Sequence, residues 1–231
     1  MQLTNKIVLI TGAKGGLGSS TTEAFLKAGA RVAGASRSIS DSDFASDAFV
    51  GIPAELTSAA SARSLVAEVL RRFERIDAVV HLVGGFAGGS PVEETDDSVV
   101  EKMMALNYWT SFHLLRAVLP AMRMQGAGCF LATGSRVAVE PGPNVAAYAA
   151  SKAALVALVR AAAAENNRYG IRANVILPST MDTKANRDSM PGADFSKWVD
   201  TAQVASLLVH LASDAASQVS GALIPIYGGE L

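Results

Sequence analysis

Short apolar runs alternate along this chain with longer segments whose apolar residues recur every three or four positions. Such runs are typical of strands buried on both faces of a parallel sheet, and the segments between them are typical of connecting helices. We predict strands at residues 7–10, 31–35, 49–52, 78–83, 128–133, 173–177 and 222–226. The alternation predicts an α/β fold with a doubly wound parallel sheet of about seven strands and helices on both faces.

Two of the predicted helices have clear limits in the sequence. The first carries an apolar face made of Leu65, Val66, Val69, Leu70 and Phe73. Thr57 and Ser58 are both candidates for its N-cap, because short polar side chains accept hydrogen bonds from the first free N–H groups of a helix. The second helix is expected from residue 97 to 119, ending at Pro120, since proline cannot donate the hydrogen bond that a helix requires.

A third predicted helix covers residues 151–167 and is apolar nearly all round. Such a helix is expected to be covered by the sheet on one side and by another subunit on the other, which predicts a homo-oligomer. No repeat or shift in composition divides the chain, so residues 1–231 are expected to form a single domain. Residues 179–199 lack clean periodicity, and they are expected to form either a lid over a ligand or a short surface helix with its loops.

Composition argues against several classes of partner. The chain has 20 basic and 21 acidic residues, so it lacks the basic excess of a nucleic-acid-binding protein. The longest apolar stretch, residues 153–164, is interrupted by Arg160 and falls short of a membrane span. Cys129 is the only cysteine, and the first residues lack the pattern of a signal peptide. We expect a cytoplasmic protein with no membrane, nucleic-acid or metal partner.

The first predicted strand leads directly into the glycine-rich sequence Thr11-Gly12-Ala13-Lys14-Gly15-Gly16-Leu17-Gly18. Glycines at 12, 16 and 18 permit a tight turn and let a pyrophosphate approach the N-terminus of the next helix, where free N–H groups and the helix dipole favour an anion. Because the sequence lies between the first strand and the first helix, it predicts a Rossmann-type dinucleotide site that includes Gly12, Gly16, Leu17 and Gly18.

The residues after the second predicted strand bear on the choice between two nicotinamide cofactors. A protein that selects NAD places a carboxylate there, against the ribose 2′-hydroxyl. This chain has Ser36 and Arg37 instead, with no acidic residue until Asp41. The Arg37 guanidinium can hold a 2′-phosphate through charge-assisted hydrogen bonds, and Lys14 can add a second positive charge. We therefore predict NADP(H) rather than NAD(H), the alternative being that Arg37 is a solvated surface residue.

Tyr148 and Lys152 are four residues apart, close to the start of the third predicted helix, so they share one helical face. A free phenol has a pKa of about 10, which is too high for acid–base catalysis at neutral pH. An adjacent ammonium favours the phenolate and is expected to lower that pKa. Tyr148 could then give a proton to a carbonyl oxygen or take one from an alcohol.

Two further positions complete a pattern that resembles the short-chain dehydrogenase/reductase family. Ser135 lies thirteen residues before Tyr148, and Asn107 lies in the second predicted helix. Together with the glycine-rich sequence and the Tyr148–Lys152 pair, they match that family essentially from end to end. The resemblance implies that Ser135 bonds the substrate oxygen, that Tyr148 is the acid or base, and that Lys152 also holds the nicotinamide ribose. Asn107 would anchor a water that passes protons to Lys152.

The same resemblance implies further cofactor contacts. Gly84 would lie beside the adenosine, and Thr183 would touch the nicotinamide amide, whereas Ser179 departs from the glycine usual in the family. The other residues expected at the cofactor are Ser36, Leu56, Tyr148, Lys152, Pro178 and Thr180. His81 replaces a family asparagine at a strand end, where we expect it to be structural rather than catalytic.

Two segments, residues 83–89 and 177–198, are also similar to quinonoid dihydropteridine reductases. The second segment includes most of the candidate lid, so this similarity concerns substrate recognition as well as framework. Those reductases prefer NADH and lack the serine that Ser135 supplies here. Within the candidate lid, Arg187 and Asp194 are candidates for selecting a polar group, whereas the aromatic and methionine side chains suit a flat or apolar ligand.

These observations predict an NADPH-dependent reductase or dehydrogenase that acts on a small carbonyl or alcohol substrate and uses Tyr148 as general acid or base. One alternative is a dihydropteridine-reductase-like enzyme acting on a quinonoid pterin. An alternative of another class is a catalytically silent protein that binds NADP(H) as a sensor. The complete set of catalytic residues favours an enzyme, since a sensor has no physical need for all four. A dimer or tetramer is the expected assembly.

Overall fold

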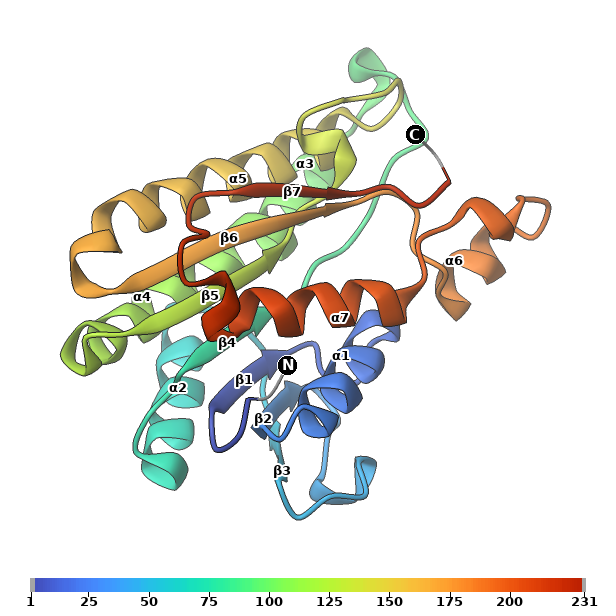
Figure 1. The fold of residues 1–231 in the computed structure, drawn as a ribbon. Coiled ribbons are helices and arrows are strands. Elements are labelled where there is room, and N and C mark those ends of the chain that lie inside the picture. Colours follow the sequence, from blue (N-terminus) through green and yellow to red (C-terminus); the bar gives the residue numbers. More distant parts are fainter. Residues whose placement is uncertain (1–2, 230–231) are drawn as a thin grey trace.

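The computed structural model describes residues 3–229, and all seven of its strands belong to one parallel sheet (Figure 1). The strands are β1 (Ile7–Thr11), β2 (Arg31–Ser36), β3 (Phe49–Pro53), β4 (Ala78–His81), β5 (Gly128–Thr133), β6 (Ile171–Pro178) and β7 (Leu223–Ile226). Their order across the sheet is β3-β2-β1-β4-β5-β6-β7. The chain therefore crosses back over the sheet between β3 and β4, as in a doubly wound Rossmann-type fold, and the predicted fold class is confirmed.

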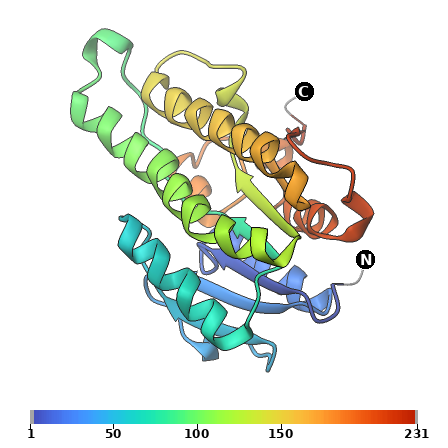
Figure 2. The ribbon, with the colours of Figure 1, turned by 90° about the vertical axis from the view of Figure 1, so that its left-hand side faces the viewer.

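Helices cover both faces of the sheet. On one face, α2 (Ala59–Phe73), α4 (Thr110–Gln125) and α5 (Ala146–Asn166) lie side by side, as Figure 2 shows. On the other face, α1 (Gly16–Lys27) packs beside α7 (Thr201–Ala212). The shorter helix α3 (Asp97–Met103) continues the line of α4 beside α5, whereas α6 (Lys184–Ser189) lies outside these layers.

The helical layers on both faces of the sheet explain the continuous apolar runs of the strands. Leu9 of β1 belongs to the core beneath α2, α4 and α5, while its neighbours Val8 and Ile10 belong to the core beneath α1 and α7. All three side chains are fully buried. Since successive side chains of a strand point to opposite faces, a strand covered on both sides must be apolar at every position.

The second predicted helix differs most from its prediction. It consists of α3, a π-helical turn at Met104–Trp109, and α4, which continues through Pro120 to Gln125. Proline is tolerated there because Pro120 and Arg116, whose carbonyl loses its helical partner, both lie on the exposed side of the helix. Gly126, with a φ of 70°, ends the helix instead.

Other element boundaries moved by a few residues. β4 ends at His81 rather than at residue 83, and α5 begins at Ala146 rather than at residue 151. Ser58, not Thr57, caps α2 by accepting a hydrogen bond from the N–H of Ser61 at 3.1 Å. Because α5 starts earlier, Tyr148 lies in the first turn of the helix. Because β4 is shorter, the loop that follows it begins at residue 82.

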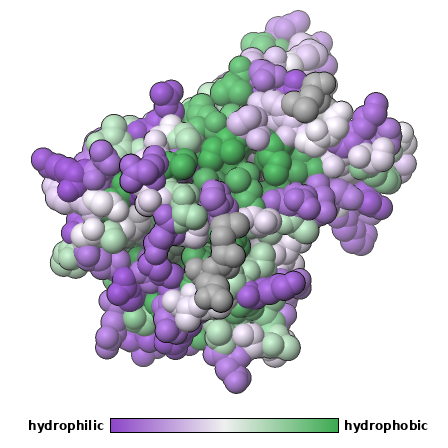
Figure 3. Space-filling model, in the orientation of Figure 1, coloured by the Kyte–Doolittle hydropathy of each residue, from purple (hydrophilic) through white to green (hydrophobic). Residues whose placement is uncertain are grey.

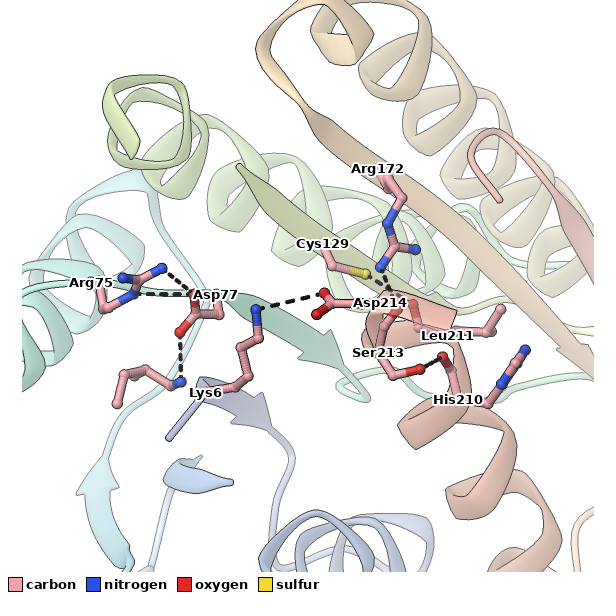
Figure 4. Close-up of polar contacts among 10 residues, drawn as sticks. Lys6, Arg75, Asp77, Cys129, Arg172, His210, Leu211, Ser213 and Asp214 are labelled. Carbon is pink, nitrogen blue, oxygen red and sulfur yellow. Dashed lines mark hydrogen bonds and ion pairs between the residues drawn. The ribbon is translucent and has the colours of Figure 1, made fainter. Parts of the chain in front are cut away.

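Polar contacts link the residues at which the strands begin, a side of the sheet that we call the amino edge; Figure 4 shows part of them. The opposite side, where the strands end, is the carboxyl edge. The Asp77 carboxylate accepts a hydrogen bond from the N–H of Ile7 at 2.8 Å and binds Arg75 through its other oxygen. The Cys129 thiol donates to the carbonyl of Leu211 at 3.6 Å, and burial raises the pKa of that thiol to about 11. These contacts tie the starts of neighbouring strands to each other and to the end of α7.

The surface seen in Figure 3 carries apolar residues over the edge strand β7, where the side chains are half-buried or, at Pro225, exposed. Within residues 3–229, one helical stretch, Ala146–Tyr169, is long and apolar enough to cross a membrane by length and composition alone. Half of its most apolar window is buried inside the chain, and it contains the buried polar residues Lys152 and Asn166. Both features fit a core helix packed on a sheet.

Candidate active site

The glycine-rich sequence forms a cradle between β1 and α1. The N–H groups of Gly12 and Ala13 both donate to the carbonyl of Ala35 in β2, which holds the turn in place. A Cβ at Gly18 would lie 1.9 Å from the carbonyl oxygen of Gly12, so no other residue fits there. The N-cap, Gly15, brings no side chain to the first N–H groups of α1, while Leu17 is anchored in the core. The cradle therefore suits a pyrophosphate.

The structure brings an acidic side chain to the end of β2 that the sequence pattern did not place there. The Lys14 ammonium lies 2.6 Å from Asp43 and donates to the carbonyl of Ser38 at 3.1 Å, and the backbone N–H of Lys14 donates to Ser36. This ion pair lowers the pKa of Asp43. Arg37 is exposed and makes no ion pair or hydrogen bond with any of the described residues.

The loop after β6 reaches the same cradle. A Cβ at Gly16 would lie 2.9 Å from the Thr183 methyl group, so Thr183, predicted at the nicotinamide, lies against the glycine-rich turn. Thr183 also caps α6 by accepting from the N–H of Asn186. Pro178 ends β6, and Thr180 accepts the N–H of Val199 through its carbonyl oxygen. The glycine cradle and the loop after β6 are thus in contact at the carboxyl ends of the strands.

Asn107 and Lys152 meet across the loop that follows β4. The Asn107 side chain is fully buried and exchanges two hydrogen bonds with the backbone of Gly85, each 3.0 Å long. It also donates to the hydroxyl of Ser151 at 3.0 Å. A Cβ at Gly84 would lie 2.7 Å from the Asn107 amide oxygen and 3.2 Å from the Lys152 nitrogen. Only glycine therefore fits at position 84.

The π-helical turn explains how Asn107 reaches this position. Its extra residue per turn directs the amide inward, toward the first turn of α5. Ser151 passes the connection on by donating to the carbonyl of Tyr148 at 2.8 Å. Asn107 therefore fixes both the loop after β4 and the backbone that carries Tyr148.

The Tyr148 phenol is largely buried, and this burial raises its pKa, while a hydrogen bond from Ser135 acts in the opposite direction. The expected lowering by Lys152 does not appear, because the Lys152 ammonium lies 5.9 Å from the centre of the tyrosine ring and donates to the carbonyl of Thr133 at 2.7 Å. Burial lowers the pKa of Lys152 itself to about 8. The phenol is thus a proton donor at neutral pH, beside an ammonium whose proton is held loosely.

Two residues singled out in the sequence, His81 and Leu56, have side chains that are buried in the core. His81 is buried between Thr11 and Thr110, with its Nδ1 2.7 Å from the Thr11 hydroxyl, and burial lowers its pKa to about 3. It is a neutral structural residue, as expected. The Leu56 side chain is packed in the core with Leu65, which leaves its backbone as the part available to a cofactor.

The 179–199 segment contains the short helix α6 and a 3-10 turn, with its ends joined by a bridge between Met181 and Val199. Its two candidate polar selectors are satisfied within the segment. Arg187 binds Asp182 through two nitrogens and stacks on Phe195, and Asp194 accepts from the hydroxyl of Ser196 at 2.6 Å.

Sequence reasoning missed three features of the site. Asp43 follows the second strand too distantly for its pairing with Lys14 to be read from the sequence. Ser151 links Asn107 to Tyr148, because its hydroxyl accepts from the Asn107 amide and donates to the Tyr148 carbonyl. Phe86 lies edge-on to Tyr148, with ring centres 5.0 Å apart. The four glycines around Phe86 were the available signal: at positions 84, 85 and 88 the backbone approaches other groups closely, and Gly89 has a φ of 114°.

The fold and this site define a Rossmann-type protein that carries a half-buried Ser135–Tyr148 pair and a buried Lys152 at the same edge of the sheet as a dinucleotide cradle. Comparison with known proteins gives the family. The model of the short chain dehydrogenase family matches residues 6–193. Levodione reductase of Leifsonia aquatica is 30% identical over 99% of this chain and 95% of its own length. A short chain dehydrogenase of Penicillium rubens, adrF, is also 30% identical, over 98% of this chain and 97% of its own length.

Solved structures agree. A crystal structure of levodione reductase has a TM-score of 0.92 and 29% identity, and covers 99% of this chain and 98% of its own. The 3-ketoacyl-(acyl-carrier-protein) reductase from Brucella melitensis, determined with NADH, has a TM-score of 0.89 and 25% identity over 99% of each chain. The protein therefore belongs to the short chain dehydrogenase family of oxidoreductases.

Proposed function

We propose that this protein is an NADP(H)-linked reductase, reversibly a dehydrogenase, for a small carbonyl or alcohol substrate. The observation that carries the proposal is the cluster of Ser135, Tyr148 and Lys152, which lies at the same edge of the sheet as the glycine cradle. The glycine turn and the first N–H groups of α1 would hold the pyrophosphate, and Thr183 and Lys152 would hold the nicotinamide end. When bound, the reduced nicotinamide supplies a hydride, which carries two electrons, to the carbonyl carbon.

The side chains then supply the proton that completes the alcohol. Ser135 donates a hydrogen bond to the substrate oxygen, and Tyr148 transfers its phenolic proton to that oxygen. The phenol is protonated at neutral pH and so has a proton to give in the reductive direction; burial raises its pKa, and the hydrogen bond from Ser135 opposes this shift. Lys152, with a pKa lowered to about 8, is suited to replace the proton, and Asn107 would support it by holding the loop and the Tyr148 backbone beside it through Gly85 and Ser151.

The four residues also argue for an enzyme over a nucleotide sensor. Asn107 and Lys152 are almost completely buried polar side chains, and burying an ammonium costs free energy. A protein that only binds a dinucleotide has no need for that cost. The proposed activity explains why Lys152 is buried, since its ammonium can bind the cofactor ribose and return a proton to Tyr148.

Replacement of Tyr148 by phenylalanine tests the proposed chemistry. We expect Tyr148→Phe to lower the rate of NADPH oxidation by about 10²- to 10⁴-fold, because the proton donor is lost while the ring is kept. Carbonyl compounds and a quinonoid pterin serve as substrates in parallel. Tyr169→Phe is the matched control, since Tyr169 lies at the far end of α5. Equal rates for wild type and Tyr148→Phe would overturn the proposed role.

Arg37 supports the proposed preference for NADP(H). It is exposed at the end of β2, where a 2′-phosphate would lie, and has no partner among residues 3–229. We expect Arg37→Asp to weaken NADPH binding at least tenfold while changing NADH binding little, as measured by fluorescence titration with each cofactor. An unchanged preference would remove Arg37 from the site.

We also propose that the protein forms a homo-oligomer, a dimer or tetramer. Several alanines of α5 are exposed, including Ala153, Ala157 and Ala161, and apolar side chains lie over the free edge of β7. Both surfaces suit contact with another copy of the chain. Sedimentation velocity tests the proposal, and a monomer at micromolar concentration would contradict it.

A further inference from the structure

Phe86 is an exposed aromatic residue next to the proposed proton donor. Its side chain is 66% exposed, although phenylalanine is usually buried. The ring meets Tyr148 in an edge arrangement, with 5.0 Å between the ring centres and 79° between the planes. This contact leaves most of the Phe86 ring open to whatever binds beside the Tyr148 hydroxyl.

The backbone holds Phe86 in this place. The N–H of Gly89 donates to the carbonyl of Asn144 at 2.8 Å, which fastens the loop after β4 to the residues before α5. A Cβ at Gly88 would lie 2.9 Å from that same carbonyl oxygen and 3.1 Å from the tip of the Phe86 ring. The close approach therefore requires glycine at position 88, and it sets the position of the ring relative to Tyr148.

The neighbouring loops at this edge of the sheet also expose apolar side chains. Val139, which follows Ser135 after β5, is 44% exposed, and Met190, at the end of α6 after β6, is 40% exposed. Two arginines of these loops are neutralised locally, since Arg136 binds Glu140 and Arg187 binds Asp182. Phe86, Val139 and Met190 are thus large apolar side chains that these loops leave exposed.

We propose that Phe86 is the apolar wall of the substrate site and selects carbonyl compounds that carry an apolar ring next to the carbonyl group. The open ring face of Phe86 stacks on the ring of the substrate, and the Tyr148 hydroxyl lies within reach of the carbonyl oxygen beside it. Polyols and sugars are disfavoured, because their hydroxyl groups would lose water against Phe86, Val139 and Met190 without gaining partners. This inference rests on the proposed role of Tyr148.

A pair of ketones with the same number of carbon atoms tests the inference. Acetophenone carries a ring beside its carbonyl and octan-2-one carries a flexible chain, so they separate ring recognition from general hydrophobicity. We expect the wild type to favour acetophenone in kcat/KM, and Phe86→Ala to lower its kcat/KM about tenfold, mainly through KM. The value for octan-2-one should change less than about threefold. Phe86→Trp should restore the preference for acetophenone.

Two further variants complete the design. Gly88→Ala keeps the Phe86 side chain but displaces it, so the preference should fall as in Phe86→Ala. Met124→Ala removes another exposed apolar side chain, on α4 far along the chain from the site, and should leave both ketones unaffected. Circular dichroism and thermal melting confirm that each variant is folded.

The outcomes separate this inference from the proposed function. A wild type that does not favour acetophenone, or a Phe86→Ala variant that loses both ketones equally, overturns ring selection by Phe86 while reduction through Tyr148 stands. Unchanged turnover by Tyr148→Phe instead overturns the proposed function, whatever Phe86 does. Reduced acetophenone turnover in Phe86→Ala with recovery in Phe86→Trp supports the inference.

Discussion

The amino and carboxyl edges of the sheet differ in how their charged and aromatic side chains are placed. At the amino edge, charged groups are paired within the chain, as in Arg75–Asp77 and Lys6–Asp214 (Figure 4). At the carboxyl edge, Lys152 is buried without a carboxylate partner, and Phe86 is exposed. The amino edge follows the rules that stabilise a fold, whereas the carboxyl edge departs from them at the residues assigned to chemistry.

This difference follows from the parallel sheet. All strands end at the same edge, so the loops after β1, β2, β4, β5 and β6 gather there on a rigid support. Some charged groups at that edge are paired, as Lys14 is with Asp43, whereas the buried ammonium of Lys152 has no carboxylate partner. Substitutions should therefore affect activity at the carboxyl edge and stability at the amino edge.

The largest expected effect comes from Lys152→Met. Removing the ammonium should lower the NADPH-dependent rate by at least about 10²-fold, because the group that we propose to bind the cofactor and replace the proton is lost. The rate is measured with saturating cofactor and compared with that of Lys184→Met, which removes an exposed lysine on α6. Retention of the rate would place Lys152 among the structural residues.

The same variant should be more stable than the wild type at pH 7. Burial lowers the pKa of Lys152 from 10.5 to about 8, so between these values the unfolded chain binds a proton that the folded chain releases. Stability from this group therefore rises with pH from about 8 to 10.5, and the full cost is present at pH 7. Lys152→Met removes this cost of about 3 kcal/mol, partly offset by the lost hydrogen bond to Thr133. Urea denaturation at pH 7 and 10 measures both effects.

At the amino edge, Asp77→Ala should act in the opposite way. The Asp77 side chain is 10% exposed and accepts the N–H of Ile7, which alanine would leave buried without a partner. We expect the free energy of unfolding to fall by about 1–3 kcal/mol with kcat unchanged. Asp77→Asn keeps an acceptor and should lose less. A loss of activity without a loss of stability would contradict the division between the edges.

Gly84→Ala should produce a smaller effect, at the carboxyl edge. The added Cβ would lie 2.7 Å from the amide oxygen of Asn107 and 3.2 Å from the nitrogen of Lys152, so both groups must shift. We expect kcat to fall about tenfold, as displacement of catalytic groups commonly costs that much or more. Gly142→Ala is the matched control, because nothing lies within 4 Å of a Cβ there. Equal kinetics of the two variants would show that the site tolerates the shift.

The smallest expected effect comes from the exposed pair at the cradle. Asp43→Asn keeps an oxygen that accepts the N–H of Ser40, but it frees the Lys14 ammonium. We expect NADPH to bind about two- to fivefold more tightly, with NADH unchanged, since exposed ion pairs are weak. Asp214→Asn breaks the comparable pair at the amino edge, Lys6–Asp214, and should change neither affinity. A gain for both cofactors would show that Lys14 does not meet the 2′-phosphate.

Prediction from the sequence succeeded where a single local rule applied. Continuous apolar runs predicted all seven strands, because burial on both faces leaves no room for polar residues. The spacing of Tyr148 and Lys152 placed them in one helix, since four residues make about one turn. His81 was correctly expected to be structural, and the structure shows it between two threonines.

Prediction failed where distant parts of the chain decide the outcome. Pro120 does not end α4, because the carbonyl that it leaves free faces the exposed side of the helix. The Lys14 ammonium is paired with Asp43, so the predicted positive charge at the cradle rests mainly on Arg37. In the 179–199 segment, Arg187 is likewise paired with Asp182. Lys152 does not lower the pKa of Tyr148, because its ammonium faces Thr133 instead.

The sequence by itself determined the parallel α/β sheet, the glycine cradle and the pairing of Tyr148 with Lys152 on one helix, because strand burial, backbone freedom at glycine and helical spacing are local properties. Only the tertiary structure decided which charges are free, how deeply Tyr148 and Lys152 are buried, and that Phe86 lies against Tyr148. Burial, pKa and substrate access depend on groups from separate strands and loops, and packing alone brings those groups together.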